Sequence, residues 1–252
     1  MLKLAPLALA LALPLSGSTQ DAKPAASKEP KKETVSSFKV FPKPGQEAAF
    51  KAALAAHVQK YHTGSWRWRV NEVMSGPDQG SYMIVEGPNS WTELDGRGDL
   101  GAEHMKDFDT NLLGVTDSSK NGPETYLTYN TEVSTAAAGA FSEKTLVRHL
   151  YVKPGRMPRV MESLKMWKKS WEKRGMNVGV WTSFFSGETQ IVLAIRLKQG
   201  WKDLDTDMLN AAKAFEEIGG PKAYETAMEE IAQTVERSVD EMIEFKAELS
   251  SK

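Results

Sequence analysis

The chain has 252 residues, of which 40% are hydrophobic and 26% are charged, as in an ordinary globular protein. Lysine and arginine number 32 and aspartate and glutamate 33, so the formal net charge is −1. This balance argues against nucleic acid as a partner, because binding to phosphates needs clustered positive charge. The absence of cysteine excludes disulfides, a lipid anchor on cysteine and thiolate metal sites.

The amino-terminal segment has the pattern of a secretory signal. Lys3 supplies a positive charge, residues 4–15 form an apolar run interrupted by two prolines, and residues 16–18 are small. The run is shorter than the roughly 20 apolar residues that a membrane-spanning helix needs. We therefore predict a signal peptide at residues 1–18, a secreted or periplasmic protein, and no stable membrane insertion after its removal. An uncleaved anchor is the alternative.

Residues 19–35 are rich in Lys, Pro, Ala and Glu and contain no aromatic residue. Such a segment cannot bury enough apolar surface to order itself, so we predict a flexible linker.

Two short motifs recur in the chain at the same spacing. Lys43-Pro44-Gly45 returns as Lys153-Pro154-Gly155, and the Trp-x-(Asp/Glu)-Leu-Asp motif at 91–95 returns at 201–205. The offset is 110 residues in both cases, which indicates a duplicated domain. We predict one domain at residues 36–134, a short linker at 135–143 and a second domain at 144–252.

The first domain begins with an extended run at residues 36–41, and the Pro44-Gly45 pair opens a helix. Phe50, Leu54, His57 and Tyr61 share one face of that helix by their three-and-four spacing. The later elements are a strand at 66–74, its hairpin partner at 81–86, helical segments at 91–95 and 101–113, and a closing strand at 125–133.

The second domain repeats this plan. Its elements are a strand at 145–152, a helix at 156–174, a hairpin at 177–185 and 190–197, helical segments at 204–218 and 224–235, and a closing strand at 243–249. The order β-α-β-β-α-β is that of a ferredoxin-like domain, so the predicted class is α+β with two tandem ferredoxin-like domains. Helices cover one face of each sheet, and we expect the two bare faces to meet as an intramolecular pseudo-dimeric α/β barrel.

With this element order, the Lys-Pro-Gly motifs and the repeated Trp motifs, residues 36–250 resemble the dimeric α/β-barrel superfamily. Its branches include antibiotic-biosynthesis-monooxygenase-like and NIPSNAP-like proteins. The resemblance implies a fold but no single reaction, since members range from cofactor-free oxygenases to haem enzymes and proteins without known activity.

The four histidines are the first candidates for chemistry. His57 is interpreted as a packed residue at the core edge, with a general base or a haem ligand as alternatives. His62 lies at the helix end, where a cation suits the helix dipole, so we expect a capping role. His104 loosely resembles the haem-ligating histidine on the second helix of the haem-degrading branch, but its polar neighbours indicate a solvated helix. His149 is a candidate for a polar group inside the barrel, or else lies at an edge.

The tryptophans are the richest feature of the sequence. Trp66 and Trp68 alternate onto one face of their strand, and Trp181 lies in the matching strand of the second domain. If that face lines the barrel, these rings and a neighbouring arginine would form an apolar pocket with polar anchors. The alternative is that they pack the two sheets together. The predicted ligand-binding residues are Trp66, Trp68, Arg69, His57, Tyr61, His149 and Trp181.

Common catalytic motifs are absent, including Gly-rich phosphate loops, His-Glu-x-x-His and Gly-x-Ser-x-Gly. We therefore predict no metal and no evident cofactor, with haem as a minor alternative. The leading functional prediction is an exported protein that binds a small apolar or aromatic ligand between its two sheets. The alternatives are an oxygenase-like enzyme, cofactor-free or haem-dependent, and a structural envelope protein without a ligand. The sequence leaves open whether the protein is an enzyme, which residues would be catalytic, and its oligomeric state.

Overall fold

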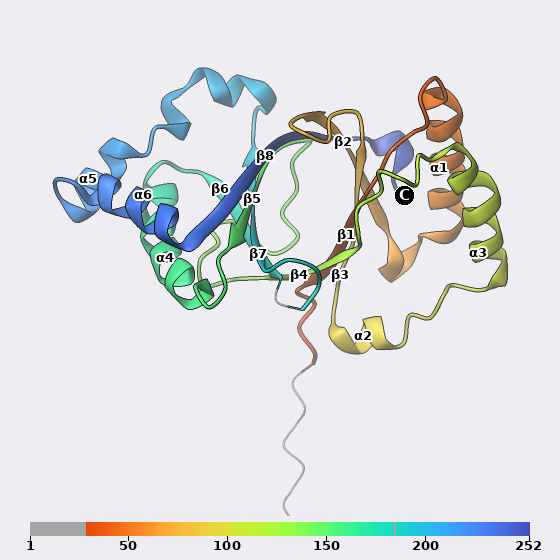
Figure 1. Cartoon of the computed structure of the whole chain (residues 1–252), viewed down its shortest axis with the longest axis horizontal. Coiled ribbons are helices and arrows are strands. Elements are labelled where there is room, and N and C mark those ends of the chain that lie inside the picture. Colours follow the sequence, from red (N-terminus) through yellow and green to blue (C-terminus); the bar gives the residue numbers. More distant parts are fainter. Residues whose placement is uncertain (1–28, 184) are drawn as a thin grey trace, which may run out of the picture.

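The computed structural model describes residues 29–183 and 185–252, which form a barrel with helices on two opposite sides (Figure 1). The predicted signal peptide and residues 19–28 of the predicted linker lie outside the described residues. Within the described part of the chain, no helix combines the length and the apolar character that crossing a bilayer requires.

Eight antiparallel strands close into one barrel in the order β1-β3-β2-β8-β5-β7-β6-β4. The strands are β1 (Thr34–Val40), β2 (Trp68–Ser75), β3 (Tyr82–Asn89), β4 (Thr125–Tyr129), β5 (Lys144–Val152), β6 (Asn177–Ser183), β7 (Gln190–Leu197) and β8 (Val235–Phe245). Closure pairs the backbone groups that an open sheet would expose at its edges. The predicted α+β class and a barrel compatible with the dimeric α/β-barrel fold are confirmed.

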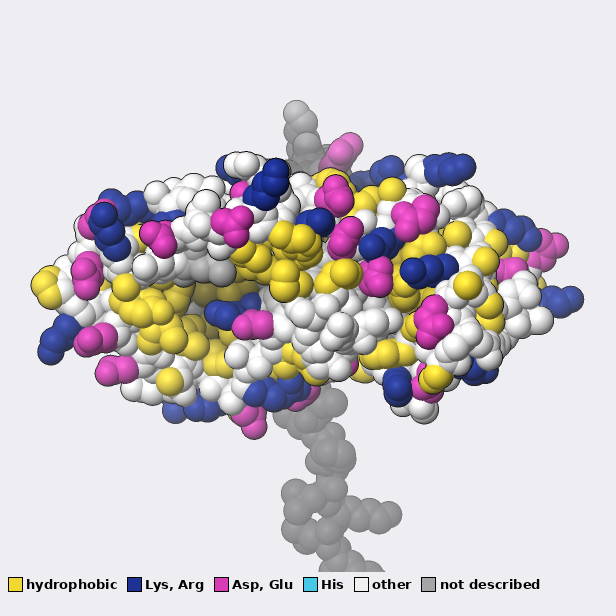
Figure 2. Space-filling view, turned by 90° about the horizontal axis from the view of Figure 1, so that it is seen from above, with side chains coloured by type: hydrophobic (Ala, Val, Ile, Leu, Met, Phe, Trp, Pro, Cys, Tyr) yellow, Lys and Arg dark blue, Asp and Glu magenta, His cyan; other side chains and the backbone are white. Residues whose placement is uncertain are grey.

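Helices from the two halves of the chain cover opposite sides of the barrel (Figure 1). The first half supplies α1 (Glu47–Tyr61), α2 (Trp91–Asp95) and α3 (Ala102–Asp107), and α3 continues as a π-helical turn, Phe108–Leu112. The second half supplies α4 (Met157–Lys173), α5 (Ala212–Gly219) and α6 (Ala223–Thr234). The face of the molecule in Figure 2 carries basic and acidic side chains interspersed over both ends.

Most strands bury side chains on both faces, because one face meets the barrel interior and the other packs under a helix. The interior core takes one or two residues from every strand. These residues are Val35, Val73, Met83, Leu127, Tyr129, Val147, Trp181, Val192 and Ile243. Under α1, Phe50, Leu54 and Val58 pack on the outer faces of β2 and β3. Val160 and Leu164 of α4 pack in the same way on the second half.

The two halves have the same internal strand order, β4-β1-β3-β2 in the first and β8-β5-β7-β6 in the second. They meet along β2–β8 and along β4–β6. The barrel interior is therefore shared by both halves, and residues far apart in the sequence face each other across it.

The Lys-Pro-Gly motif forms the same tight turn in both halves, and it precedes the helix rather than opening it. The amide of Gln46 donates to the Lys43 carbonyl at 2.9 Å, and the amide of Arg156 donates to the Lys153 carbonyl at 3.0 Å. Gly45 has φ +76° and its counterpart in the second half +73°. Proline followed by a residue at positive φ is the pattern of a type II turn, which explains why both residues recur together.

The closing strands differ from the sequence expectation of 125–133 and 243–249. β4 ends at Tyr129, because the Asn130 side chain accepts hydrogen bonds from two following amides and makes a turn. β8 begins at Val235, directly after α6, and Ala247–Leu249 is a 3₁₀ turn. The first half of β8 is polar and mostly exposed, so its strand character comes from pairing with β5 and not from alternation.

Replacing Leu54 with alanine tests the packing of α1 on the barrel. Leu54 is fully buried, so we expect the free energy of unfolding in urea to fall by about 2–5 kcal/mol. The exposed Met74 is the control, and Met74→Ala should change the same quantity by no more than about 0.5 kcal/mol. Equal effects of the two substitutions would contradict the described packing.

Candidate functional site

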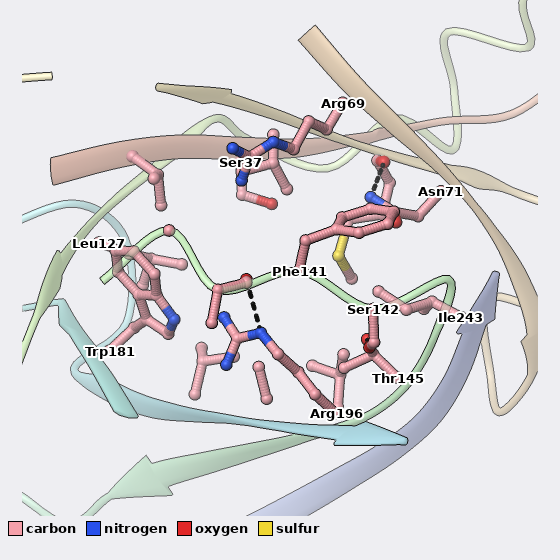
Figure 3. A pocket seen from close by; sticks show the side chains of 18 of the residues that line it. Ser37, Arg69, Asn71, Leu127, Phe141, Ser142, Thr145, Trp181, Arg196 and Ile243 are labelled. Carbon is pink, nitrogen blue, oxygen red and sulfur yellow. Dashed lines mark hydrogen bonds between the residues drawn. The ribbon is translucent and has the colours of Figure 1, made fainter. Parts of the chain in front are cut away.

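A cavity of about 140 Å³ lies inside the barrel, between strands of both halves (Figure 3). Most of its wall is apolar, with Trp181 and Leu127 on one side and Ile243 on the other. The polar side chains on the wall are those of Ser37, Arg69, Asn71, Ser142, Thr145, His149 and Arg196. An apolar cavity with a few polar groups is the usual form of a small-molecule site.

Arg196, on β7, brings a guanidinium group to this cavity. Its Nε donates to the Ala140 carbonyl at 2.7 Å, while its Nη1 is buried and has no hydrogen-bond partner. The group lies against Gly179 of β6, where a Cβ atom would come within 2.7 Å of Nη1. The missing side chain at Gly179 is therefore what makes room for the guanidinium.

Arg69, on β2, lies on the opposite wall of the cavity (Figure 3). The Arg69 side chain makes no hydrogen bond or ion pair with the described residues. No aspartate or glutamate lines the cavity with it. Burial lowers the pKa of Arg69, with a smaller effect of Arg67, and burial also lowers the pKa of Arg196. Both groups stay charged, because an arginine is not deprotonated in proteins. The cavity thus holds positive charge without a matching carboxylate.

The segment between the halves forms part of the cavity wall. Gly139, Ala140, Phe141 and Ser142 all line the cavity, and Figure 3 shows this segment passing across it. Phe141 is 58% exposed and its ring packs edge-to-face on Phe245, with 4.9 Å between centroids. The predicted linker at 135–143 therefore also contributes to the candidate site.

His149, on β5, lines the cavity from the side of a buried ion-pair network. Its Nδ1 lies 3.1 Å from Gln190 Oε1, and its Nε2 lies 3.4 Å from Glu241 Oε2. Glu241 also accepts a hydrogen bond from Lys39. Burial alone would raise the pKa of Glu241, but the contacts with His149 and Lys39 together lower it. This carboxylate is therefore held ionised beside the histidine.

A second cluster of candidate residues lies outside the barrel, at the end of α1. His57 of α1, His62 directly after it and His104 of α3 form this tri-histidine cluster, and they are 1%, 0% and 6% exposed. The Nε2 atom of His62 lies 3.3 Å from Nε2 of His57 and 3.3 Å from Nε2 of His104. Three ring nitrogens thus converge on one point.

The opposite ring nitrogen, Nδ1, has an oxygen partner in each of the three histidines. The partners are Asp107 Oδ2 for His57 at 2.7 Å, the Trp66 carbonyl for His62 at 3.2 Å, and the Asp99 carbonyl for His104 at 2.7 Å. Burial lowers the pKa of His62 to about 4 and lowers that of His57 as well. The rings of His57 and His62 are therefore neutral at ordinary pH.

Glu86 of β3 supports the cluster from the barrel side. Trp68 stacks on the His62 ring at 3.5 Å between centroids and donates its Nε1–H to Glu86 at 2.8 Å. Arg97 donates two hydrogen bonds to the same carboxylate, at 2.7 and 2.8 Å. Burial alone would raise the pKa of Glu86, but His62, Arg97 and Trp68 together lower it.

The structure divides the predicted ligand-binding residues between two places. Arg69, His149 and Trp181 line the barrel cavity. His57, Tyr61 and Trp68 lie at the tri-histidine cluster, and Trp66, in the turn after α1, reaches it through its carbonyl. Alternation along β2 explains the division, because Trp68 packs under α1 and the next residue faces the interior.

Two histidine expectations are corrected by the structure. His62 does end α1, where its amide donates to the Val58 carbonyl, but it is no cation there, because its ring is buried under Trp68 and burial keeps it neutral. His104 is not on a solvated helix face, because it turns toward α1 and away from its polar neighbours. The sequence interpretation also missed Arg196. The 110-residue offset gives no signal for this residue, since it matches Arg196 with Glu86, which lies outside the barrel beside Trp68.

The two histidines considered above as haem ligands do not face the barrel cavity. His57 and His104 are buried outside the barrel, and their Nδ1 atoms face Asp107 Oδ2 and the Asp99 carbonyl. The barrel cavity, at about 140 Å³, is close in size to one that holds benzene, about 150 Å³, which is far smaller than a macrocycle.

Comparison with known proteins supports the fold alone. No protein-family profile matches the chain, and no curated protein is similar to it in sequence. An anthrone oxidase-like protein has a similar structure, with a TM-score of 0.54 and 13% identity over 86% of this chain and 92% of the other. A candidate monooxygenase from Fusobacterium nucleatum subsp. nucleatum has a TM-score of 0.52 and 11% identity over 84% and 92%. A candidate chlorite dismutase has a TM-score of 0.50 and 8% identity over 86% and 96%. These proteins belong to the dimeric α/β-barrel superfamily, whose fold the chain shares.

Replacing Arg97 with alanine tests the network around Glu86. The substitution leaves a buried carboxylate without its cation, so we expect unfolding free energy to fall by about 3–5 kcal/mol at neutral pH. The lowered pKa of Glu86 means that its ionised form stabilises the fold above its ordinary pKa of 4.5 and that this contribution disappears on acidification. The difference between variant and wild type in urea unfolding should therefore shrink as the pH falls below that value.

The exposed Arg67 provides the matched control, and Arg67→Ala should leave stability nearly unchanged. Adding Glu86→Gln to Arg97→Ala should recover part of the loss, because no buried charge then remains unpaired. A difference that is independent of pH would contradict the assigned role of the carboxylate.

Proposed function

We propose that the protein binds a small organic anion with an apolar or aromatic body in the cavity inside its barrel. The observation that carries this proposal is the pair Arg69 and Arg196, which face one largely apolar cavity without any carboxylate on its wall. The sharing of the cavity by both halves supports a site that exists only in the closed barrel.

The charge of the cavity selects the ligand class. A buried charged group is costly unless it is paired, and the described residues leave Nη1 of Arg196 unpaired. A guanidinium binds carboxylates with two parallel hydrogen bonds. An anionic ligand would therefore provide the charged partner that the protein itself does not offer to these arginines. A neutral ligand could accept a hydrogen bond but would leave both positive charges without a counter-charge.

The size and the walls of the cavity define the rest of the ligand. Its volume of about 140 Å³ is close to that of a cavity that accommodates benzene, about 150 Å³, so one ring with a short substituent fits. Trp181 and Phe141 supply aromatic surfaces in the lining of the cavity. Aromatic rings pack favourably on such surfaces in offset or edge-to-face contact. An aromatic carboxylate with a single ring is the simplest molecule with these properties.

We also infer that the two halves are tandem ferredoxin-like domains. Their equal strand orders and the recurrence of the Lys-Pro-Gly turn at the same point of each half support this interpretation. The fully buried Phe50 and Leu54 of α1 match Val160 and Leu164 of α4 at the 110-residue offset.

An oxygenase-like reaction on the same ligand is the second candidate, and the position of His149 favours it. His149 lines the cavity, and the ionised Glu241 beside it would stabilise an imidazolium formed when the ring takes the proton of a phenolic hydroxyl on the ligand, whose anion would then donate the electrons that reduce O₂. The test is oxygen uptake in the presence of a bound anion. Uptake that His149→Ala abolishes while binding persists would support catalysis, and binding without uptake would leave a binding function.

Benzoate is the probe for the proposed site, with benzyl alcohol as its uncharged counterpart. We expect saturable quenching of tryptophan fluorescence by benzoate, a much weaker response to benzyl alcohol, and loss of the signal in Trp181→Phe. Arg69→Ala and Arg196→Ala should each weaken benzoate binding by about 10- to 100-fold, as expected for hydrogen bonds to a charged group.

Two further substitutions sharpen this test. Arg67→Ala changes an exposed arginine on the same segment and should leave benzoate binding unchanged. Gly179→Ala should displace the Arg196 guanidinium and weaken binding while the barrel stays folded, because the displaced group is the end of a flexible side chain. If no aromatic anion gives a saturable response, the proposal is wrong and a structural role is favoured.

A further inference from the structure

The geometry points to a metal site outside the barrel. We propose that the tri-histidine cluster of His57, His62 and His104 binds one divalent transition-metal ion of the zinc type through the three Nε2 atoms. The sequence motifs predicted no metal, since the three ligands follow no known local spacing and come together only in the folded chain.

The hydrogen-bond partners of the Nδ1 atoms determine which nitrogens are free to bind a metal. A carboxylate oxygen and two backbone carbonyl oxygens face these atoms, and all three groups can only accept. Each Nδ1 therefore carries the ring proton, and each Nε2 of the neutral ring carries a lone pair. Three lone pairs then converge without a hydrogen between them, an arrangement that a bound cation relieves.

Two of the distances between the nitrogens match those of a coordination sphere. Ligands at about 2.0–2.1 Å from a tetrahedral zinc ion lie about 3.3–3.4 Å apart. The Nε2 atom of His62 is 3.3 Å from that of His57 and 3.3 Å from that of His104, and all three atoms lie within 4.8 Å of one another. An ion placed between them would bring His57 and His104 to a similar distance from each other.

The surroundings of the cluster hold the rings in place. Histidine ligands of metals regularly donate their other nitrogen to a carboxylate or carbonyl, which fixes the tautomer and the ring orientation. Asp107 has this position for His57, and Trp68 stacks on His62. Tyr61 and Phe108 pack against the remaining ring surfaces, so that the site is largely enclosed by aromatic groups.

The ligand set selects the class of metal. Imidazole nitrogens suit zinc, copper, iron and nickel, whereas calcium and magnesium require oxygen ligands. Three histidines without a fourth protein ligand among the described residues leave one position for water or another small ligand. His57 lies on α1, His62 directly follows it, and His104 lies on α3. The ion would therefore also link α3 to α1.

Cobalt titration of the purified protein, first stripped with EDTA and dialysed, tests the site. Co²⁺ reports a four-coordinate histidine site by intense visible ligand-field bands. We expect these bands to saturate at one ion per chain and to disappear when Zn²⁺ is added. Failure of benzoate binding would not affect this result, since none of the three histidines lines the barrel cavity.

Variants locate the ion. His104→Ala should abolish the bands, and His149→Ala, which alters the one histidine outside the cluster, should retain them. Because replacing a buried ligand can disturb folding, Asp107→Ala provides a milder variant at a partly exposed position. It removes a positioning residue and not a ligand, and should weaken cobalt affinity by about 10- to 100-fold.

Two results would overturn the proposal. One is a wild-type protein without a saturable cobalt spectrum. The other is a spectrum that persists unchanged in both His104→Ala and Asp107→Ala, which would place the ion elsewhere. In each variant, circular dichroism establishes that the barrel is folded before the spectrum is interpreted.

Discussion

Closure of the eight strands into a barrel is the constraint on which the other features depend. In a closed sheet with helices on its outside, consecutive residues of a strand point alternately into the barrel interior and toward the helices. One step along β2, from Trp68 to Arg69, leads from the tri-histidine cluster to the barrel cavity. The two candidate sites thus lie back to back on the same strand, and the single backbone path positions both.

The two sites differ in whether their buried charged groups have a partner of opposite charge. Outside the barrel, Glu86 is paired with Arg97 and accepts a third bond from Trp68, so the network is complete without a ligand. Inside, Arg69 and Arg196 have no carboxylate partner among the described residues. Nearly all buried polar groups in native proteins have a hydrogen-bond partner. A buried polar group without one is therefore a candidate for a functional role. The same reasoning applies to the three lone pairs of the histidine cluster.

The likeness to oxidase-like and dismutase-like proteins extends over most of the chain but concerns the backbone only. At 13% identity or less, the fold is shared while side chains at the sites are free to differ. The candidate functions therefore depend on this chain's own residues. The position of Gly179 against Arg196 illustrates the point, because a single missing Cβ atom determines whether a guanidinium can occupy the cavity.

The sequence by itself determined the α+β class, the recurrence at an offset of 110 residues and the approximate position of most strands and helices, because periodicity and turn residues act locally. It did not determine the inner face of β2, the extent of β8 or the partners of His104. Those depend on contacts between residues far apart in the chain, such as the pairing of β8 with β5 and the 42 positions between His62 and His104. Local patterns carry no information about such contacts, so only the tertiary structure decided which buried groups meet and which remain unpaired.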